Sequence, residues 1–283
     1  MGSNLVQAQD DIEPVTVVGH RLALGVSYRG TNYSGWQSQI NSNTVQDELE
    51  KALASFMAAE SIRVRCAGRT DAGVHGLNQV VHFNTELHRE PASWVRGTNR
   101  FLPKDIAVQW CRAVPADFNS RGSALGRRYV FLILESPVRP SIEVGVAGWS
   151  FRPLDVDRMR DAAARLIGEH DFTAFRSAQC QALSPIKTLK SLTMRKAGAY
   201  WRFEFDGTAF LHHMIRNIMG CLVSIGGGFH DPAWMTEILE GRDRKYAAPT
   251  FPADGLYFVG PYYDPALGIP EHTPPMDWLP GSA

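Results

Sequence analysis

The order of hydrophobic patterns along the chain is repeated, and this repetition limits the folds that the chain can adopt. A strand-like run is followed by an amphipathic helix, two strands, a second helix and a closing strand, and the same order then starts again. In the first half we predict strands at 22–28, 62–66, 80–83 and 106–113, with helices from Thr44 and at 94–101. In the second half we predict strands at 128–135, 189–195, 201–206 and 256–263, with helices at 156–167, 212–225 and 232–240.

Each half therefore has the order β-α-β-β-α-β, which is the split ferredoxin-like unit. Two such units can join their sheets edge to edge. We therefore expect an α+β protein with one mixed, mainly antiparallel sheet, helices on one face and a cleft between the two ferredoxin-like halves. The expected domains are a flexible leader at 1–18, an N-terminal ferredoxin-like domain at 19–115, a C-terminal one at 116–265 and a flexible tail at 266–283.

The charge of the chain is balanced, with 29 Lys and Arg against 29 Asp and Glu. A net charge of zero argues weakly against a nucleic-acid binder, because basic side chains supply most of the affinity for phosphate backbones. The basic residues are nevertheless clustered in two groups, namely Arg89, Arg96, Arg100 and Lys104, and then Arg121, Arg127 and Arg128. Solvated surfaces carry such clusters too, so charge alone leaves the matter open.

The four cysteines are far apart and form no Cys-x-x-Cys pair. This spacing predicts no zinc site, and scattered thiols suit a reducing cytosol. The first residues are acidic where a signal peptide is basic and then apolar, and no apolar run approaches the roughly eighteen residues of a membrane span. We therefore expect a cytoplasmic protein with no membrane segment and no bound metal.

The stretch 67–77 is the strongest indication of function. It places Arg69 and Asp71 on a loop between two predicted strands, with Gly68 and Gly73 beside them. Glycine permits backbone angles and close approaches that a Cβ atom forbids, and sharp loops on rigid scaffolds often carry catalytic side chains. The alternative is a simple turn in which the side chain of Asp71 hydrogen-bonds its own backbone.

This loop belongs to a longer pattern. The seven residues 69–75, Arg-Thr-Asp-Ala-Gly-Val-His, resemble the signature of the tRNA pseudouridine synthase A family. Further segments resemble the same family in the same order, namely 28–37 with 44–46, 123–129, 170–175, 210–217 and 252–256. Together they span most of the chain, so the resemblance is more specific than a single motif.

The resemblance implies an isomerase that converts uridine to pseudouridine in the anticodon stem-loop of tRNA, at positions 38–40. It implies Asp71 as the nucleophile, Arg216 as its ion-pair partner, Tyr129 as the residue that meets the uracil ring, and Arg69 as the arginine that helps to flip the uridine out of its stem. It further implies tRNA as the partner, a homodimer, an RNA-binding cleft and no cofactor. The chemistry agrees on the cofactor, since the reaction breaks the C1′–N1 bond, turns the base and rejoins it through C5 without a redox change.

The surroundings of Arg216 give this assignment partial support. Its neighbours in the predicted helix are apolar, so the guanidinium should lie deep, where an unpaired charge costs several kcal/mol. Some carboxylate must therefore meet it. By the resemblance this is Asp71, while the residues alone also allow Glu204, Asp206 or a side chain that extends to water.

Tyr129 and Arg69 also have plainer interpretations. We predict that Tyr129 stacks on a base, because removal of the C5 proton would need a phenol whose pKa is shifted from about 10. The alternative is that Tyr129 is an ordinary tyrosine of a buried strand. Arg69 can fill the space that a flipped base leaves, or it can clamp a phosphate at the surface.

The remaining candidates are assigned to RNA contacts or to packing. Contacts with RNA phosphates are predicted for four basic side chains, Arg121, Arg127, Arg128 and His212. For His212 and its neighbour His213 we predict helix packing with a phosphate contact rather than a catalytic pair. His75 and His82 lack the His or Cys company of a metal site and are predicted to be packed or hydrogen-bonded.

Other classes of protein compete with this interpretation. A non-catalytic RNA-binding protein would keep the fold and the charge, and only the presence of Asp71, Tyr129 and Arg216 argues against it. A zinc nucleobase deaminase is disfavoured because the chain has no Pro-Cys-x-x-Cys motif. An aspartate-dependent hydrolase would need a second catalytic carboxylate, for which we find no motif.

Overall fold

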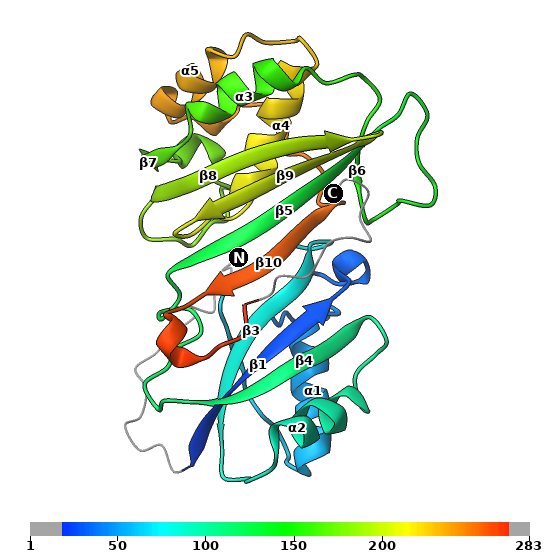
Figure 1. Ribbon diagram of the computed structural model, residues 1–283, viewed down its shortest axis with the longest axis vertical. Helices are drawn as coiled ribbons and strands as arrows, with labels where there is room; N and C mark the ends of the chain where they lie inside the picture. The colour runs from blue at the N-terminus through cyan, green and yellow to red at the C-terminus, as the bar shows by residue number, and fades with distance from the viewer. Residues whose placement is uncertain (1–18, 272–283) are drawn as a thin grey trace, which may run out of the picture.

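The structure is a computed structural model, and it describes residues 19–271. Its strands are β1 (His20–Tyr28), β2 (Arg65–Cys66), β3 (His75–Thr85), β4 (Ile106–Val114), β5 (Gly126–Glu135), β6 (Gly148–Ser150), β7 (Gly168–Asp171), β8 (Ile186–Ala197), β9 (Tyr200–Gly207) and β10 (Leu256–Tyr262). They form one ten-stranded sheet in the order β4-β1-β3-β10-β5-β9-β8-β7, with β2 paired to β3 and β6 paired to β5 (Figure 1). Among the pairs of the described chain β3–β10 and β5–β6 are parallel, so the predicted mixed, mainly antiparallel sheet is confirmed.

Each half is a ferredoxin-like unit, as predicted. The first half contains α1 (Val45–Met57) and α2 (Pro91–Asn99), and the second contains α3 (Val156–Ala164), α4 (Met214–Gly226) and α5 (Trp234–Gly241). In both halves the fourth strand lies beside the first, then the third, then the second, which gives β4-β1-β3-β2 and β10-β5-β9-β8. The boundary predicted after residue 115 falls in the connection between β4 and β5.

Local patterns account for these elements. The hydroxyl of Thr44 accepts a hydrogen bond from the N–H of Asp47 at 3.3 Å, so Thr44 caps the start of α1 as its sequence predicts. In β9, every second side chain from Trp201 to Phe205 is buried, and the residues between them are partly exposed. This period of two places one face of the strand against a core.

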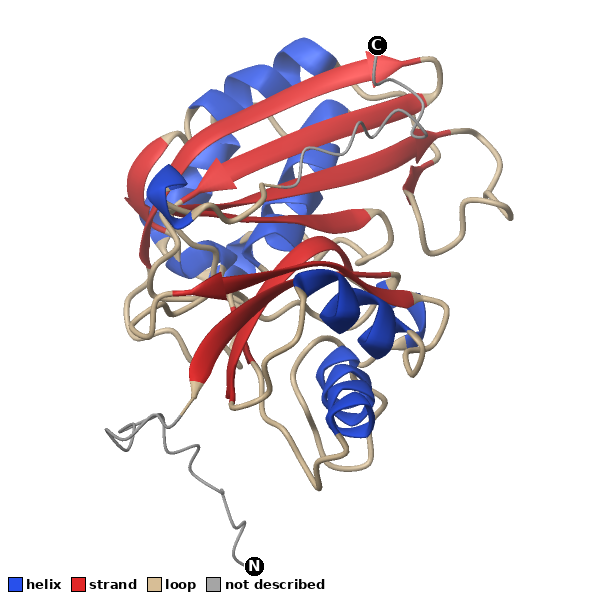
Figure 2. Ribbon diagram, turned by 60° about the horizontal axis from the view of Figure 1, so that its bottom comes forward, coloured by secondary structure: helices blue, strands red, loops and turns tan. Residues whose placement is uncertain are grey.

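The helices lie on one face of the sheet. In Figure 1 α1 and α4 pass behind the strands, and the turned view of Figure 2 places α1 and α2 beneath the strands of the first half. Two separate apolar cores result, one around Trp94 and Leu49 under the first half and one around Phe203 and Ile218 under the second. Within residues 19–271, we find no helix that combines the length and the hydrophobicity needed to cross a bilayer.

The two halves are joined through the parallel pair β3–β10, in which His75 lies opposite Tyr257 and Gly76 opposite Phe258. The pair can form because β2, which borders the same edge of β3, is only two residues long. The strand that we predicted at 62–66 was therefore too long. Its first part leaves the sheet because the N–H of Val64 donates to the carboxylate of Glu50 on α1 at 3.0 Å.

Other predicted boundaries differ as well. The short strands β6 and β7 were not predicted, and α4 begins at Met214 rather than at residue 212. Residues 266–271, assigned to the flexible tail, pack on the sheet, where the carbonyl oxygen of Pro270 accepts from Asn78 at 3.2 Å. The predicted leader at 1–18 and the rest of the predicted tail lie outside the described residues.

Candidate active site

Asp71 lies in the connection between β2 and β3, on a turn that depends on glycine. The N–H of Val74 donates to the carbonyl oxygen of Asp71 at 3.1 Å, and Gly73 has a φ of 82°. These are the features of a type II turn, whose third residue needs a positive φ. The backbone of Asp71 closes the turn, and its carboxylate is left to face another segment.

Contacts with an earlier segment hold the turn in place. The carbonyl oxygen of Thr70 accepts from the N–H of Trp36 at 3.0 Å, and the hydroxyl of Thr70 lies 2.8 Å from that of Tyr28. A Cβ atom on Gly35, which has a φ of 92°, would lie 2.6 Å from the carbonyl oxygen of Thr70. Glycine therefore lets the two backbones meet. The conspicuous segment 28–37 thus supports the position of Asp71.

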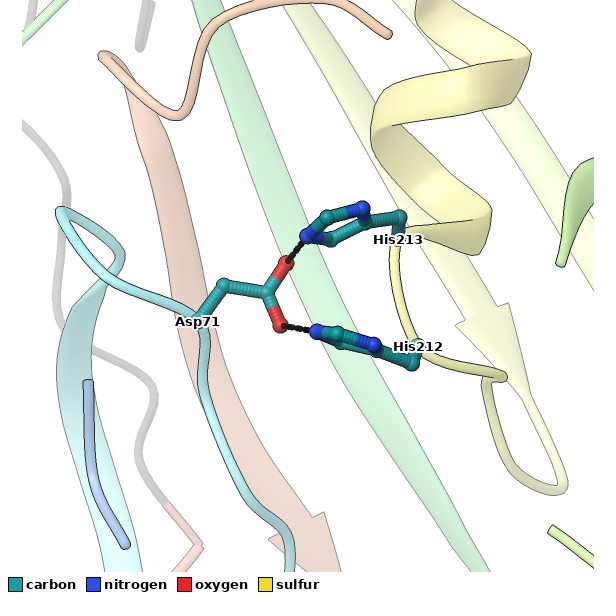
Figure 3. A group of neighbouring side chains, drawn as sticks. All are labelled: Asp71, His212 and His213. Atoms are coloured by element: carbon teal, nitrogen blue, oxygen red, sulfur yellow. Dashed lines mark ion pairs between the residues drawn. The ribbon is translucent and has the colours of Figure 1, made fainter. Parts of the chain in front are cut away.

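Three side chains, two just before α4 and one in its first turn, surround the Asp71 carboxylate. Nη1 of Arg216 donates to Oδ2 at 3.3 Å, and Nε2 of His213 lies 3.5 Å from the same oxygen. Nε2 of His212 lies 3.3 Å from Oδ1, and Figure 3 shows both imidazole rings pointing toward the carboxylate. The side chains of Asp71 and Arg216 are only 17% and 16% exposed, so the ion pair is largely shielded from water.

The pairing of Arg216 with Asp71 is thus present, as predicted, and the alternative carboxylates are engaged elsewhere. Glu204 pairs with Arg195 and Arg202, each at 2.8 Å. Asp206 accepts a hydrogen bond from a tyrosine hydroxyl on β10. Arg216 is also held by a second contact, since its Nε donates to the carbonyl oxygen of Phe251 at 2.9 Å.

The pKa of Asp71 is lowered although the residue is buried. Burial is the largest single influence and by itself raises the pKa. The hydrogen bond with His212 and the charges of His213, His212 and Arg216 together outweigh it. The positive end of the α4 dipole, which begins at Met214, acts in the same direction. Asp71 is therefore a carboxylate at neutral pH.

The two oxygens of this carboxylate are held differently. Oδ2 faces Arg216 and His213, whereas Oδ1 faces His212 alone among the described side chains. A carboxylate oxygen can accept about two hydrogen bonds, so Oδ1 keeps a lone pair free. The site can thus hold the carboxylate in one orientation and leave Oδ1 available to form a bond.

Tyr129, on β5, lies in an aromatic group beside the site. Its ring centroid is 5.2 Å from that of Phe210, at an angle of 77°, and 4.9 Å from that of Phe258. Burial, and then the charge of Asp71, raise the pKa of the Tyr129 phenol well above its usual value, against a smaller effect of Arg127. The phenol therefore stays protonated at neutral pH. What Tyr129 offers a ligand is its ring and a neutral hydroxyl.

Arg69 is exposed on the same loop and connects the two halves. Its Nε donates to Oε1 of Gln37 in the first half at 3.0 Å, and its Nη1 donates to Oε1 of Gln181 in the second half at 2.8 Å. Each such hydrogen bond contributes about 1 kcal/mol, so a ligand can displace it.

The predicted phosphate contacts are of two kinds. Arg121 is exposed, and Arg128 pairs with Glu271 and lies 5.2 Å from the ring centroid of Tyr262. Arg127 instead donates to three backbone carbonyl oxygens, those of Ala67, Arg121 and Thr208. Its side chain is thus committed to the protein itself.

His75 and His82 are packed and hydrogen-bonded, as predicted. Nδ1 of His75 accepts from the N–H of Gly30 at 3.1 Å, and its Nε2 lies 2.6 Å from the carbonyl oxygen of Gly145. Nδ1 of His82 accepts from the N–H of Ser120 at 3.2 Å. Burial is the main cause that lowers the pKa of both rings, that of His82 to about 4, so both are neutral imidazoles.

Asp71, His212 and His213 also have the composition of a metal site, since their ligand atoms lie within 4.8 Å of one another. The guanidinium of Arg216, however, is bound to the same carboxylate, and its positive charge opposes a divalent cation there. The two histidines and Arg216 are therefore better suited to hold the Asp71 carboxylate than to form a metal centre with it.

Sequence reasoning missed the two histidines as partners of Asp71. It treated them as residues of the helix, whereas His213 precedes α4 with a left-handed φ of 64°. The available signal was their position three and four residues before Arg216, which was itself expected to face Asp71. Residues just before the first turn of a helix can contact the same atom as a side chain within that turn.

Comparison with known proteins gives a consistent result. The family model described as tRNA pseudouridine synthase matches residues 25–121 and 162–264, which include Asp71 and Arg216 but not Tyr129. Proteins named tRNA pseudouridine synthase A are 65% identical over 260 residues in Methylibium petroleiphilum, 61% over 264 in a Polaromonas species and 57% over 282 in Delftia acidovorans. Each comparison covers 92% of this chain and 100% of the relative.

The carboxyl of Asp71 is expected to titrate below the usual value of about 3.9. Its carbon-13 NMR signal, identified by its loss in Asp71→Asn, measures this directly. Replacement of His212 by Phe should move the midpoint upward, because it removes the hydrogen bond that is the largest influence lowering the pKa. A lowered pKa also means that the contribution of Asp71 to stability is present above the unfolded pKa and is lost as the pH falls through the folded pKa.

The control is His170→Phe, since His170 contacts Ile167 and Phe172 rather than Asp71. An Asp71 midpoint above the usual value in the wild type, or one that His212→Phe leaves unchanged, would contradict this account of the site.

Proposed function

The chain belongs to the tRNA pseudouridine synthase family, and from this premise we propose that it converts uridine to pseudouridine at positions 38–40 in the anticodon stem-loop of tRNA, with Asp71 as the nucleophile. The observation that carries the proposal is the set of contacts that hold the Asp71 carboxylate, by Arg216 and His213 on Oδ2 and by His212 on Oδ1. A nucleophile for a nucleotide has to be charged, oriented and partly free at one oxygen. Asp71 meets all three conditions.

The reaction needs little beyond such a carboxylate. Asp71 forms a bond to the nucleotide through Oδ1, and the C1′–N1 bond breaks with its electron pair leaving on N1. The base turns, the C1′–C5 bond forms and the Asp71 carboxylate is released. The proton on C5 is then lost and N1 gains one, so atoms and charge balance. The donors around Asp71 favour its release as an anion.

The other residues of the site are assigned to the handling of the uridine. Tyr129 supplies an aromatic surface for the uracil ring, since its phenol is protonated and Phe210 and Phe258 fix the ring. Arg69 fills the space left by the flipped uridine. Arg69 is exposed and its hydrogen-bond partners are neutral glutamine side chains. Both facts support this role, because no ion pair in the described chain has to break before the guanidinium moves. Flipping itself costs a few kcal/mol.

For the RNA backbone we propose contacts by Arg121 and Arg128. Arg121 is exposed, and Arg128 is partnered by the exposed Glu271, a type of ion pair that contributes about 1 kcal/mol or less. An RNA phosphate can therefore replace that carboxylate. His212 is better explained by its contact with Asp71 than by a phosphate contact.

The proposed enzyme is a homodimer that works in the cytoplasm. The family resemblance supports the dimer. The four cysteines are free thiols, which suits a reducing compartment, and immunoblots of cell fractions check the location.

The reaction is tested by tritium release from C5-labelled uridine in an unmodified tRNA transcript, with EDTA present because the mechanism needs no metal. Wild-type protein should release tritium, and Asp71→Asn should lower the rate by about ten-thousand-fold while it still binds the tRNA. A transcript with cytidine at positions 38–40 should release none.

Three outcomes would contradict parts of the proposal. Equal release by Asp71→Asn would remove Asp71 from its role. Release from the cytidine transcript would move the reaction to other uridines. RNA binding without release by the wild type would favour the non-catalytic RNA-binding protein.

The role of Tyr129 is tested by two substitutions. Tyr129→Phe keeps the ring and should lower the rate by less than about tenfold, whereas Tyr129→Leu removes a stacking surface worth about 1–3 kcal/mol per base and should lower it more. If Tyr129→Phe is as inactive as Tyr129→Leu, the hydroxyl takes part in the chemistry and the stacking role is insufficient.

The homodimer is tested by light scattering coupled to gel filtration. The expected mass is twice the 31.4 kDa of one chain. A mass of one chain at micromolar concentrations, with full tritium release, would show that the monomer is the active form.

A further inference from the structure

Arg127 connects three segments that are far apart in the sequence. Its Nη1 donates to the carbonyl oxygen of Thr208 at 2.9 Å, and its Nη2 donates to those of Ala67 at 3.2 Å and Arg121 at 2.7 Å. Ala67 begins the loop that carries Asp71, and Thr208 begins the connection from β9 to His212. One guanidinium thus binds both segments whose side chains meet at Asp71.

The surroundings of Arg127 explain why an arginine stands there. Within residues 19–271 it has no carboxylate partner, and burial lowers its pKa. Its charge is therefore stabilised chiefly by the three carbonyl dipoles. A planar fork of N–H groups can serve several acceptors in fixed directions, which the single ammonium of a lysine cannot do.

The neighbouring basic residues differ from Arg127 in this respect. Arg121 is exposed, and Arg128 interacts with a surface carboxylate and the face of an aromatic ring. Their side chains can turn to a phosphate without loss of structure. Arg127 would have to give up three hydrogen bonds to do the same, at about 1 kcal/mol or more each.

Arg127 also shares its strand face with Tyr129, because side chains two residues apart on a strand point the same way. In the sheet Arg127 lies opposite Gly207, the residue before Thr208. A shift of its guanidinium would therefore displace the Asp71 loop and the His212 segment together, and it would change the surroundings of Tyr129.

We propose that Arg127 is a positioning residue, whose guanidinium sets the separation between the Asp71 loop and the segment that carries His212, His213 and Arg216. This inference rests on the function proposed above. Arg127 touches no reacting atom. It acts through the backbone of Ala67 and Thr208, and an error of about 1 Å in such a separation can lower a rate by about a hundredfold.

The test compares Arg127→Lys with Arg158→Lys. Arg158, on α3, also donates to two backbone carbonyl oxygens, those of Ile225 at 3.2 Å and His230 at 2.7 Å. These lie at and beyond the end of α4, whereas Asp71 lies at its beginning. The control therefore removes similar hydrogen bonds, but far from the site.

For Arg127→Lys we expect kcat for tritium release to fall about a hundredfold, with the KM for tRNA and the salt dependence of binding unchanged. The acid limb of the pH–rate profile should move to higher pH, because Asp71 loses donors that lower its pKa. Arg158→Lys should leave kcat, KM and the profile as in the wild type. Urea unfolding of both variants shows how much each substitution affects stability.

Two results overturn the proposal. A higher KM with kcat unchanged, and a salt slope reduced by about one, would make Arg127 a phosphate contact. A lower unfolding midpoint with kcat and the pH profile of the folded enzyme unchanged would make its role purely structural.

A failure of the proposed function can be told apart from a failure of this inference. If wild-type protein releases no tritium, the carbon-13 titration of Asp71 in Arg127→Lys still tests the geometry. A raised midpoint supports the positioning role, and an unchanged midpoint overturns it.

Discussion

The parallel pair of β3 and β10 is the contact on which the candidate site depends. It joins two ferredoxin-like units through the alignment of His75 with Tyr257 and of Gly76 with Phe258. Asp71 comes from the first unit, and its partners His212, His213 and Arg216 come from the second. Because the sheet is continuous, a short stretch of main-chain pairing fixes the relative position of side chains that are 145 residues apart. The shortness of β2 is what leaves this edge of β3 open.

Within that frame the site is governed by a competition between burial and electrostatics. Burial of Asp71 favours the neutral acid, and two imidazoles and a guanidinium favour the anion and prevail. The same burial, together with the charge of Asp71, keeps Tyr129 protonated. One carboxylate and one phenol thus have distinct protonation states at neutral pH because of what surrounds them, and this separates their roles in the proposed reaction. Arg127 acts on the backbone of the same site, since it binds the two loops that set the distances between Asp71 and its partners.

Much of this could be predicted from the sequence. The alternation in β9 and the Thr44 cap identify their elements correctly, and the repeated order of elements gives the two-unit sheet. The errors have physical causes. A side chain on α1 draws Val64 out of the expected strand, and a left-handed residue at 213 delays the start of α4. Neither effect is visible in a local pattern, because the first depends on a residue fourteen positions away and the second on a positive φ, which is uncommon in residues other than glycine.

The sequence by itself determined the order of the elements, the glycine-dependent turn at Asp71 and the need of Arg216 for a carboxylate. These follow from side-chain period, backbone sterics and the cost of a buried charge, which are properties of single segments. Only the tertiary structure decided that this carboxylate is Asp71 rather than Glu204 or Asp206, that two histidines share it, and that Arg127 faces the protein rather than solvent. Periodicity identifies the face on which a side chain lies. The partner that it meets depends on strand register and on the approach of distant loops, which are set when the two units pack together.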